Sequence, residues 1–241
     1  IATPGRLLDL IGQQHVKLGH VELLVLDEAD RLLDMGFIRD VKKIVAATPR
    51  KRQSLLFSAT MPDAVAELAA EMLYKPVRVE VAPKQVTVEK IDQRVTMVAT
   101  PDKLAAIEHI LRRDDDKKAI AFTRTKHGAD KVARKLRNAG INAEAIHGNK
   151  SQNARNRALD GFKNGDTWVL VATDIAARGI DIDGVTHVVN FELPHEPESY
   201  VHRIGRTGRA GAAGSAWSLV DPSEVKRLRA VERLIRMPIT Q

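Results

Sequence analysis

The chain of 241 residues contains no cysteine, and only 4% of its residues are aromatic. The absence of cysteine excludes disulfides and thiolate metal sites, and it permits a cytoplasmic location, which is our expectation. No apolar run approaches the roughly 20 residues that a membrane-spanning helix needs. Gly-Lys dipeptides are also absent, so a Gly-rich phosphate-binding loop with its lysine is not encoded in these residues.

The net charge of +7 arises entirely from the second part of the chain. Residues 1–83 contain 11 Lys and Arg and 11 Asp and Glu, whereas the remainder contains 27 against 20. An excess of positive charge on one part favours a polyanion as partner. The segment 226–236 has a simpler interpretation as a helix with one solvated, charged face. Its apolar positions are Leu228, Val231, Leu234 and Ile235.

Strands and helices alternate along the whole chain, which predicts an α/β fold of parallel sheets with flanking helices. The first part predicts helices at 3–12 and 62–73, strands at 23–27 and 54–60, and an edge strand at 77–81. The strands 23–27 and 54–60 are short apolar runs, so we expect them to be covered on both faces. The second part predicts helices at 102–112, 128–138, 151–163, 198–204 and from 223 onward, and strands at 118–123, 143–146, 168–173, 186–191 and 215–220.

A domain boundary is predicted where residues 82–95 show neither a helical period nor a compact apolar block. We therefore assign residues 1–83 to part of a first lobe, 84–91 to a linker and 92–241 to a complete second lobe. The first lobe supplies only about three strands, fewer than a sheet usually has. An incomplete sheet exposes a strand edge, so self-association through that edge is expected.

Two acids follow the first apolar strand. Asp27 and Glu28 come directly after residues 23–26, at the carboxyl end where parallel sheets bind ligands. Asp27 could bind Mg²⁺ through water, and Glu28 could orient or deprotonate an attacking water. The alternative is a helix N-terminus stabilised by two acids.

Small polar residues, Ser58 to Thr60, end the next strand of the first part. They could cap the helix that begins near Pro62. They could instead form hydrogen bonds with the turn at 27–30 and couple the nucleotide state to the neighbouring lobe.

Three arginines stand among glycines in the segment 200–211, YVHRIGRTGRAG. Arg203 and Arg206 are three residues apart, which places them on one face of a helix. Arg209 follows a Thr-Gly pair that allows a sharp turn. Planar guanidinium groups suit phosphate oxygens, so this segment predicts a phosphate contact.

Two further segments carry polar groups at predicted strand and helix ends. Thr173 and Asp174 end a strand, and Asp181 could accept hydrogen bonds from ribose hydroxyls; a strand-to-helix turn with a capping Asp is the alternative. Gln152 and Arg155 follow a helix N-terminus at 151 that could contact a phosphate backbone, although a solvated helix face is equally compatible. The eight histidines are scattered singly, without the spacing of a metal site.

The order of six motifs resembles that of the DEAD-box RNA helicases. TPGR, DEAD, SAT, HGNKSQNAR, ATDIAARGID and HRIGRTGRAG occur in the family's sequence and extend over essentially the whole chain, most like the bacterial RhlE-type branch. The resemblance implies two RecA-like lobes that close over ATP and single-stranded RNA, with ATP and Mg²⁺ as cofactors. ATP hydrolysis would be coupled to local RNA duplex unwinding, through contacts mainly to the sugar-phosphate backbone. The few aromatic residues fit backbone contacts better than base stacking.

The resemblance also implies residue roles. Asp27 and Glu28 would serve magnesium and hydrolysis, Asp181 would bind the ribose, and Arg206 and Arg209 would reach the γ-phosphate. Coupling between the lobes would involve Asp30, Ser58, Thr60 and His202. RNA contacts would come from Thr3, Gly5, Arg6, Thr123, Gln152, Arg155, Thr173 and Asp174.

In the family, the phosphate-binding loop and an adenine-reading Gln motif lie upstream of TPGR, where this sequence begins. We therefore expect a truncated helicase whose 241 residues alone lack ATP hydrolysis. A non-catalytic RNA-binding or interaction module built on the second lobe is the alternative from another class, and a DNA-directed relative is a third possibility.

Overall fold

The computed structural model describes residues 1–80, 91–112, 118–177, 182, 184–208 and 213–240, except the side chain of residue 34. The chain divides into two compact units, residues 1–81 (unit 1) and 82–241 (unit 2). The predicted linker 84–91 lies outside the described residues apart from Ile91, which begins a strand. No described helix is long and apolar enough to cross a membrane.

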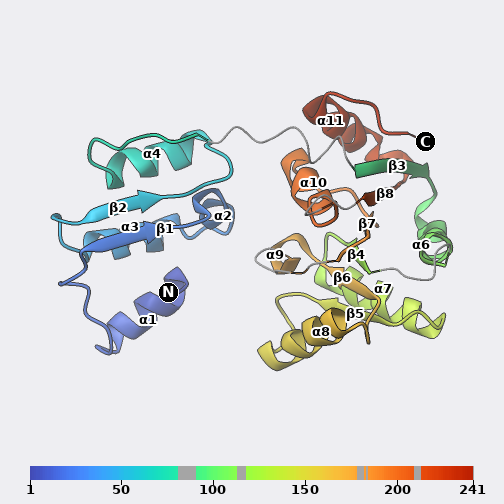
Figure 1. Cartoon of the computed structure of the whole chain (residues 1–241), viewed down its shortest axis with the longest axis horizontal. Coiled ribbons are helices and arrows are strands. Elements are labelled where there is room, and N and C mark those ends of the chain that lie inside the picture. The colour runs from blue at the N-terminus through green and yellow to red at the C-terminus, as the bar shows by residue number, and fades with distance from the viewer. Residues whose placement is uncertain (81–90, 113–117, 178–181, 183, 209–212, 241) are drawn as a thin grey trace. The chain divides into compact units, whose positions relative to one another are not determined.

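Unit 1 contains two parallel strands among its described residues, β1 (Leu23–Leu26) and β2 (Gln53–Leu56), paired in register from Leu23 and Gln53 onward. Its helices are α1 (Pro4–Gly12), α2 (Ala29–Asp34), α3 (Ile38–Ala46) and α4 (Asp63–Met72). Pro4 stands at the first turn of α1, where its missing N–H costs nothing. Helix α1 packs against α3, and α2 packs against α4 (Figure 1).

Three expectations for unit 1 are wrong. Residues 77–80 form no strand although they alternate in polarity, and Val77 and Val79 are exposed. The described part of the sheet therefore has two strands instead of about three. Its strands are also not covered on both faces, because Leu23 and Val25 remain 53% and 48% exposed. A two-stranded sheet lacks the neighbours that would bury them.

Unit 2 contains a six-stranded parallel sheet in the order β3-β8-β7-β4-β6-β5 (Figure 1). Its strands are β3 (Ile91–Met97), β4 (Ala119–Phe122), β5 (Ala143–Ile146), β6 (Val169–Ala172), β7 (His187–Asn190) and β8 (Gly214–Val220). Its helices are α6 (Lys103–Leu111), α7 (Lys126–Asn138), α8 (Gln152–Asn164), α9 (Asp174–Ala177), α10 (Pro197–Ile204) and α11 (Val225–Ile235). The short 3₁₀ turns η1 (Thr100–Asp102) and η3 (Pro222–Glu224) precede α6 and α11. The α/β class with parallel sheets and flanking helices is thereby confirmed.

Two apolar clusters fill the faces of this sheet. One joins α6 and α7 to the strand residues that face them, and the other joins α8, α10 and α11 to the opposite set. Every residue of β4 and β6 is buried, as expected for central parallel strands with both faces covered. The carboxyl ends of these strands therefore present residues from a rigid base.

Strand β3 was not among the predicted strands, although residues 92–97 belong to the predicted second lobe. It alternates between buried and exposed residues, and Ile91 and Val95 enter the core. At its open edge it receives Thr240, whose carbonyl accepts a hydrogen bond of 2.7 Å from the N–H of Val95. The end of the chain thus extends the sheet beyond β3, a strand that the sequence did not predict.

Candidate functional site

The acids of unit 1 lie at the carboxyl end of β1, as predicted. Asp27 follows the strand directly, and its carboxylate accepts a hydrogen bond of 2.9 Å from the N–H of Glu28. Glu28 adopts a left-handed backbone conformation, with φ of 51°, which is strained for a residue with a side chain. Its carboxylate forms an ion pair with Arg31 on the first turn of α2. Both acids are exposed, so they can meet a ligand from solvent.

Asp30 joins the ends of the two strands of unit 1. Its carboxylate accepts hydrogen bonds from the hydroxyl and the N–H of Thr60, at 2.8 and 2.9 Å, and its own N–H donates to Ser58 Oγ at 3.0 Å. The Ser58 hydroxyl in turn donates to the carbonyl of Thr60. Burial raises the pKa of the Asp30 carboxyl, but the hydrogen bonds from Thr60 and Arg31 outweigh it and lower the pKa below its ordinary value. Of the two interpretations of Ser58 and Thr60, the structure favours the hydrogen-bonded one.

The predicted RNA-binding residues of unit 1 belong to the start of α1. Thr3 precedes the helix without a capping hydrogen bond from its side chain, and a side chain added at Gly5 would meet open space. Arg6 pairs with Asp9 one turn later, and Asp9 also accepts from Gln13 at 2.7 Å. No hydrogen bond or ion pair among the described residues connects this group to the acids after β1.

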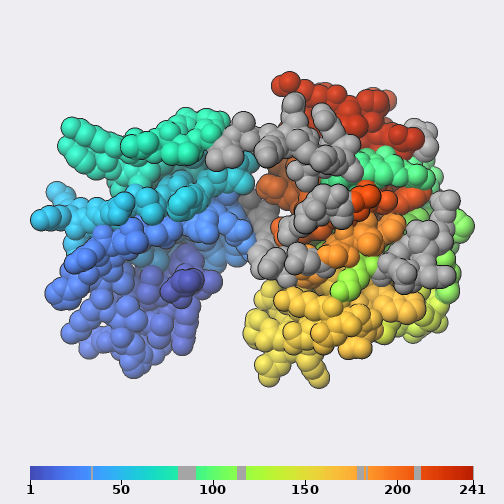
Figure 2. All heavy atoms as spheres, viewed as in Figure 1, coloured from blue at the N-terminus to red at the C-terminus, as the bar shows by residue number. Residues whose placement is uncertain are grey.

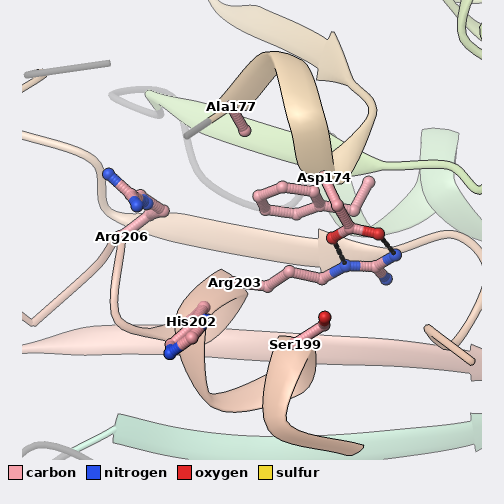
Figure 3. Close-up of a pocket in the computed structure, with 7 residues that line it drawn as sticks. Asp174, Ala177, Ser199, His202, Arg203 and Arg206 are labelled. Carbon is pink, nitrogen blue, oxygen red and sulfur yellow. Dashed lines mark hydrogen bonds and ion pairs between the residues drawn. The ribbon is translucent and has the colours of Figure 1, made fainter. Parts of the chain in front are cut away.

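A small pocket in unit 2 lies where the end of β4, the start of α9 and the end of α10 meet (Figure 3). Its walls include four residues that carry chemistry, Asp174, Ser199, His202 and Arg206, as well as Phe122, Ala177 and Arg203. His202 is exposed and Arg206 half-buried, so both can meet a solute. The sequence did not single out Ser199, which is one helical turn before Arg203.

Arg203 is part of the protein's interior. Its side chain is 1% exposed, and its Nε and Nη2 donate to the two carboxylate oxygens of Asp174 at 2.6 and 2.8 Å, as Figure 3 shows. Nη1 donates to Asn190 at 3.0 Å and to the carbonyl of Glu192 at 2.7 Å. The guanidinium also lies 5.0 Å from the ring centre of Phe122. The predicted phosphate role of Arg203 is therefore wrong, because Asp174, Asn190 and Glu192 already occupy its donors.

Arg206 lies beyond the end of α10, which stops at Ile204. The expectation that Arg203 and Arg206 share one helical face is consequently wrong. Thr207 fixes this turn: its buried hydroxyl donates to the carbonyls of Val185 and Thr186 at 2.6 and 3.0 Å. A Cβ at Gly214 would come within 2.5 Å of the Thr207 hydroxyl, so the adjacent start of β8 must be glycine for the turn to fit.

The strand-end residues predicted to contact RNA are less accessible than expected. Thr123 is fully buried, and its hydroxyl donates to the carbonyl of Thr125 at 3.1 Å. Thr173 is 9% exposed, and its carbonyl accepts from Ala176 and Ala177 at the start of α9. The turn at the end of β6 therefore leads into a helix, with Asp174 as its first residue.

Gln152 and Arg155 lie on the first turn of α8, where Ser151 caps the helix through a hydrogen bond from Ala154 of 3.3 Å. Gln152 donates to Asn156 at 2.9 Å. Arg155 has a buried Nε for which the described residues supply no acceptor. Such an unsatisfied donor suits an external acceptor.

His147 is buried: its Nδ1 accepts from the N–H of Asn149, and its Nε2 lies 3.0 Å from Asp130.

Two predicted ligand contacts, Asp181 and Arg209, lie outside the described residues. The described part of the chain also contains no group of three His, Asp or Glu residues that could hold a metal ion. One exposed carboxylate, that of Asp27, still fits a magnesium ion that takes most of its ligands from water and phosphate.

An ion pair that the sequence did not reveal supports the strand ends of unit 2. The carboxylate of Glu192, just after β7, accepts from the N–H and the guanidinium of Arg124, both at 2.9 Å. Burial raises the pKa of Glu192, yet the bonds from Arg124 outweigh it and lower the pKa. Each residue lies two positions beyond the end of a strand, which is the signal that could have identified them.

Comparisons with known proteins cover both units. The profile described as DEAD/DEAH box helicase matches residues 1–68, and that described as Helicase conserved C-terminal domain matches residues 102–211. The DEAD-box ATP-dependent RNA helicase CshA of Streptococcus pneumoniae is 48% identical over 236 residues, which are 98% of this chain and 45% of that protein. CshA of Bacillus subtilis is 47% identical over 97% of this chain and 47% of its own length.

Solved structures agree in fold. Dbp5 of S. cerevisiae, bound to RNA and ADP BeF3, is 34% identical with a TM-score of 0.87, over 98% of this chain and 62% of that one. The E. coli DEAD-box protein SrmB, bound to regulator of ribonuclease activity A, is 41% identical with a TM-score of 0.60, over 62% of this chain and 89% of that one. The present chain spans a little under half the length of the two CshA proteins.

Proposed function

Because this chain belongs to the family of DEAD-box RNA helicases, we propose that it supplies part of the ATP and RNA sites of an ATP-dependent RNA helicase. The whole protein would hydrolyse ATP when RNA is bound and separate short RNA duplexes. The observation that carries this proposal is the end of β1, where two exposed acids precede Asp30 and its bonds to Thr60. The finer assignment to an RhlE-type branch stays a prediction.

In unit 1, the proposed roles follow from exposure and bonding. Asp27 would hold a magnesium ion through water, and that ion would supply charge to the phosphates. Glu28 would orient the attacking water and accept its proton. Since the Glu28 carboxylate pairs with Arg31 in the structure, that ion pair must open before Glu28 can act. Asp30, Ser58 and Thr60 would communicate the state of this site through their shared hydrogen bonds.

In unit 2, Arg206 would stabilise charge on the γ-phosphate, as would Arg209, and Asp181 would bind the ribose. His202 would take part in coupling the two units. Arg203 has a positioning role instead, because it ties Asp174 to the end of β7 and so fixes the base of the pocket.

RNA binding is proposed for Thr3, Gly5 and Arg6 in unit 1 and for Gln152 and Arg155 in unit 2. The unsatisfied Nε of Arg155 supports this role most directly. Thr123, Thr173 and Asp174 are engaged within the protein, so we propose that they act on RNA by shaping the strand ends. The contacts would go to phosphates and sugars and carry little sequence preference.

Turnover by these 241 residues alone is not expected, because they contain no Gly-Lys dipeptide to bind the phosphates. We predict no RNA-stimulated phosphate release in a malachite-green assay. Robust release that Glu28→Gln abolishes would contradict this prediction. In a chimera that places the upstream segment of B. subtilis CshA before this chain, RNA-stimulated release should appear and should be lost with Glu28→Gln. Absence of release from a folded chimera would count against the helicase assignment.

The alternative is an RNA-binding module formed by unit 2 without catalysis, which the +7 excess favours. Both hypotheses require RNA binding through phosphate contacts. Filter binding of RNA across a salt series tests this requirement, since phosphate contacts give a steep salt dependence. Competition between RNA and DNA oligonucleotides of the same sequence distinguishes these two RNA-binding hypotheses from a DNA-directed protein. Equal competition would overturn the RNA assignment.

A further inference from the structure

A groove runs along α11 and the residues that follow it, and nothing in the proposed function accounts for it. Its volume is about 720 Å³, and it is lined by Lys226, Arg229, Glu232, Arg233, Arg236 and Met237. We refer to it as the α11 groove. Helix α11 forms part of the surface of unit 2, in red in Figure 2.

The four cations of the α11 groove share one side of the helix for a structural reason. Leu228 and Val231 are buried in the core and fix which side of α11 faces inward. Lys226, Arg229 and Arg233 follow at intervals of three and four residues, so they line up on an exposed side. Through Arg236 the row extends over roughly 15 Å at 1.5 Å per residue.

This row carries uncompensated positive charge. Among the described residues, no carboxylate lies within ion-pair distance of these four cations, whereas neighbouring Arg227 lies 3.9 Å from Glu224. Glu232 is the one acid in the lining, and its carboxylate accepts from the N–H of Ile239 at 3.0 Å. An ordinary solvated helix face intersperses charges of both signs. The α11 groove instead has four cations against one acid, so it keeps a net positive charge that a mixed solvated face would not have.

The direction of the row relates it to the strand ends. Helix α11 follows the carboxyl end of β8, and Thr240 then pairs in parallel with Arg94 in β3. The helix must therefore run antiparallel to the strands, away from the edge that carries the pocket. A polyanion bound at the strand ends could continue along the groove. The bonds of Glu232 to Ile239 and of Val95 to Thr240 fix the far end of the groove.

We propose that the α11 groove binds the phosphate backbone of the RNA strand that flanks the segment held at the strand ends. The proposal rests on the proposed RNA-binding function and adds a second contact surface to it. Three of the four cations are arginines, whose forked donors match phosphate oxygens. Cations spaced along about 15 Å suit a strand with one phosphate per roughly 3.4 Å of helix axis. A protein partner would require apolar or aromatic anchors at the centre, and the lining offers Met237 and Pro238 alone.

The test uses the 241-residue chain and fluorescein-labelled oligo(U) of 10 and 30 nucleotides, with binding measured by fluorescence anisotropy between 50 and 200 mM KCl. Arg229→Glu/Arg233→Glu should weaken binding of the 30-mer about tenfold or more. The affinity for the 10-mer should fall by less than about threefold. For the 30-mer, the slope of log affinity against log salt concentration should decrease in magnitude by about 1.4. Each phosphate contact to a single strand contributes about 0.7 to this slope, and the variant loses two such contacts. Arg229→Gln/Arg233→Gln should show the same pattern with smaller losses.

The matched control is Lys131→Glu/Arg134→Glu on α7, which reverses two exposed cations three residues apart. It should leave both oligonucleotides bound within about twofold of the parent chain. The groove proposal is overturned if the α11 variants bind the 30-mer like the parent, if they lose both lengths equally, or if the α7 control loses as much. Failure of the parent chain to bind either RNA would instead remove the proposed function, and with it the basis of the groove. Unchanged tryptophan fluorescence verifies that each variant is folded.

Discussion

Unit 1 and unit 2 place polar chemistry at the carboxyl ends of parallel strands, but their scaffolds differ. In unit 1, Leu23 and Val25 of β1 are about half exposed, and the described sheet has two strands. In unit 2, all of β4 and β6 is buried between two layers of helices. Burial of apolar surface is the main stabilising term in a fold. The comparison indicates that unit 2 is stable by itself and that unit 1 is only marginally so.

The polar groups follow the same division. In unit 2, buried Arg203 connects α9, β7 and α10, and buried Lys103 forms an ion pair with buried Glu224. In unit 1, the corresponding connection is the half-exposed set around Asp30 and Thr60. The polar groups that connect the elements of unit 2 are thus buried in its core, whereas those that connect the strands of unit 1 lie near its surface.

The substitution expected to have the largest effect on stability is Phe162→Ala in unit 2. Phe162 lies fully buried between α8 and the sheet, and removing a buried aromatic ring costs about 3–5 kcal/mol of unfolding free energy. Both tryptophans, Trp168 and Trp217, belong to unit 2, so urea unfolding followed by tryptophan fluorescence reports on that unit. The matched variant Val25→Ala in unit 1 should leave this transition unchanged. If Val25→Ala shifts it comparably, the two units unfold together and the comparison fails.

A second test separates two arginines of one motif. Arg203→Ala leaves the Asp174 carboxylate and the Glu192 carbonyl without their donor, and we expect a loss of about 3 kcal/mol, the lower end for a broken buried pair because Asp174 is partly exposed. Arg206→Ala, at a half-buried position beyond α10, should cost less than about 1 kcal/mol. Tryptophan-detected urea unfolding measures both. Equal losses would show that Arg203 is not the structural member of the motif.

This pair of arginines shows where the sequence was sufficient and where it was not. The motif and its place after β7 were predictable from the spacing of Arg and Gly and from the preceding apolar run. The end of α10 at Ile204 was not, so the shared helical face was wrong. The partner of Arg203 was also hidden, because Asp174 lies 29 residues away in sequence and meets it only in the folded sheet.

The central strands and the edge strand β5 were predictable from the sequence, whereas the edge strand β3 and the absence of a strand at 77–80 were not. Central β4 and β6 are continuous apolar runs, which the sequence identifies. Residues 77–80 alternate clearly but have no strand beside them in the part of the chain that the structure describes. Strand β3 was missed because polar Gln93 occupies an inward position. Its side-chain oxygen accepts from the hydroxyl of Tyr200 at 2.8 Å. Edge strands depend on such tertiary partners, which local pattern does not show.

Acid should affect unit 2 through Asp221. Its carboxylate accepts from Ser223 and, at 2.7 Å, from the hydroxyl of Thr100, and these bonds lower its pKa to about 2. Because the folded pKa is lowered, the stabilisation is complete above the unfolded pKa of about 3.9 and is lost as pH falls toward 2. Asp221→Asn keeps an acceptor oxygen but loses the charge that strengthens these bonds, so it should cost about 1 kcal/mol of unfolding free energy at pH 7. The difference in stability between parent and variant should narrow below about pH 4. A gap independent of pH in tryptophan-detected unfolding would contradict this assignment.

The smallest expected effect concerns the corresponding acid of unit 1. Thr60→Val removes one of the hydrogen bonds that lower the pKa of Asp30, at a cost below about 1 kcal/mol because the pair is half exposed. Hydrogen exchange measured by mass spectrometry should show faster exchange in peptides spanning 23–33 and 53–62, with α7 and β6 of unit 2 unchanged. Since the pKa of Asp30 is lowered, its contribution is present above pH 4 and is lost as pH falls through the folded value, so parent and variant should converge in acid. Faster exchange throughout unit 2 would mean that the bonds around Asp30 stabilise more than the unit that contains them.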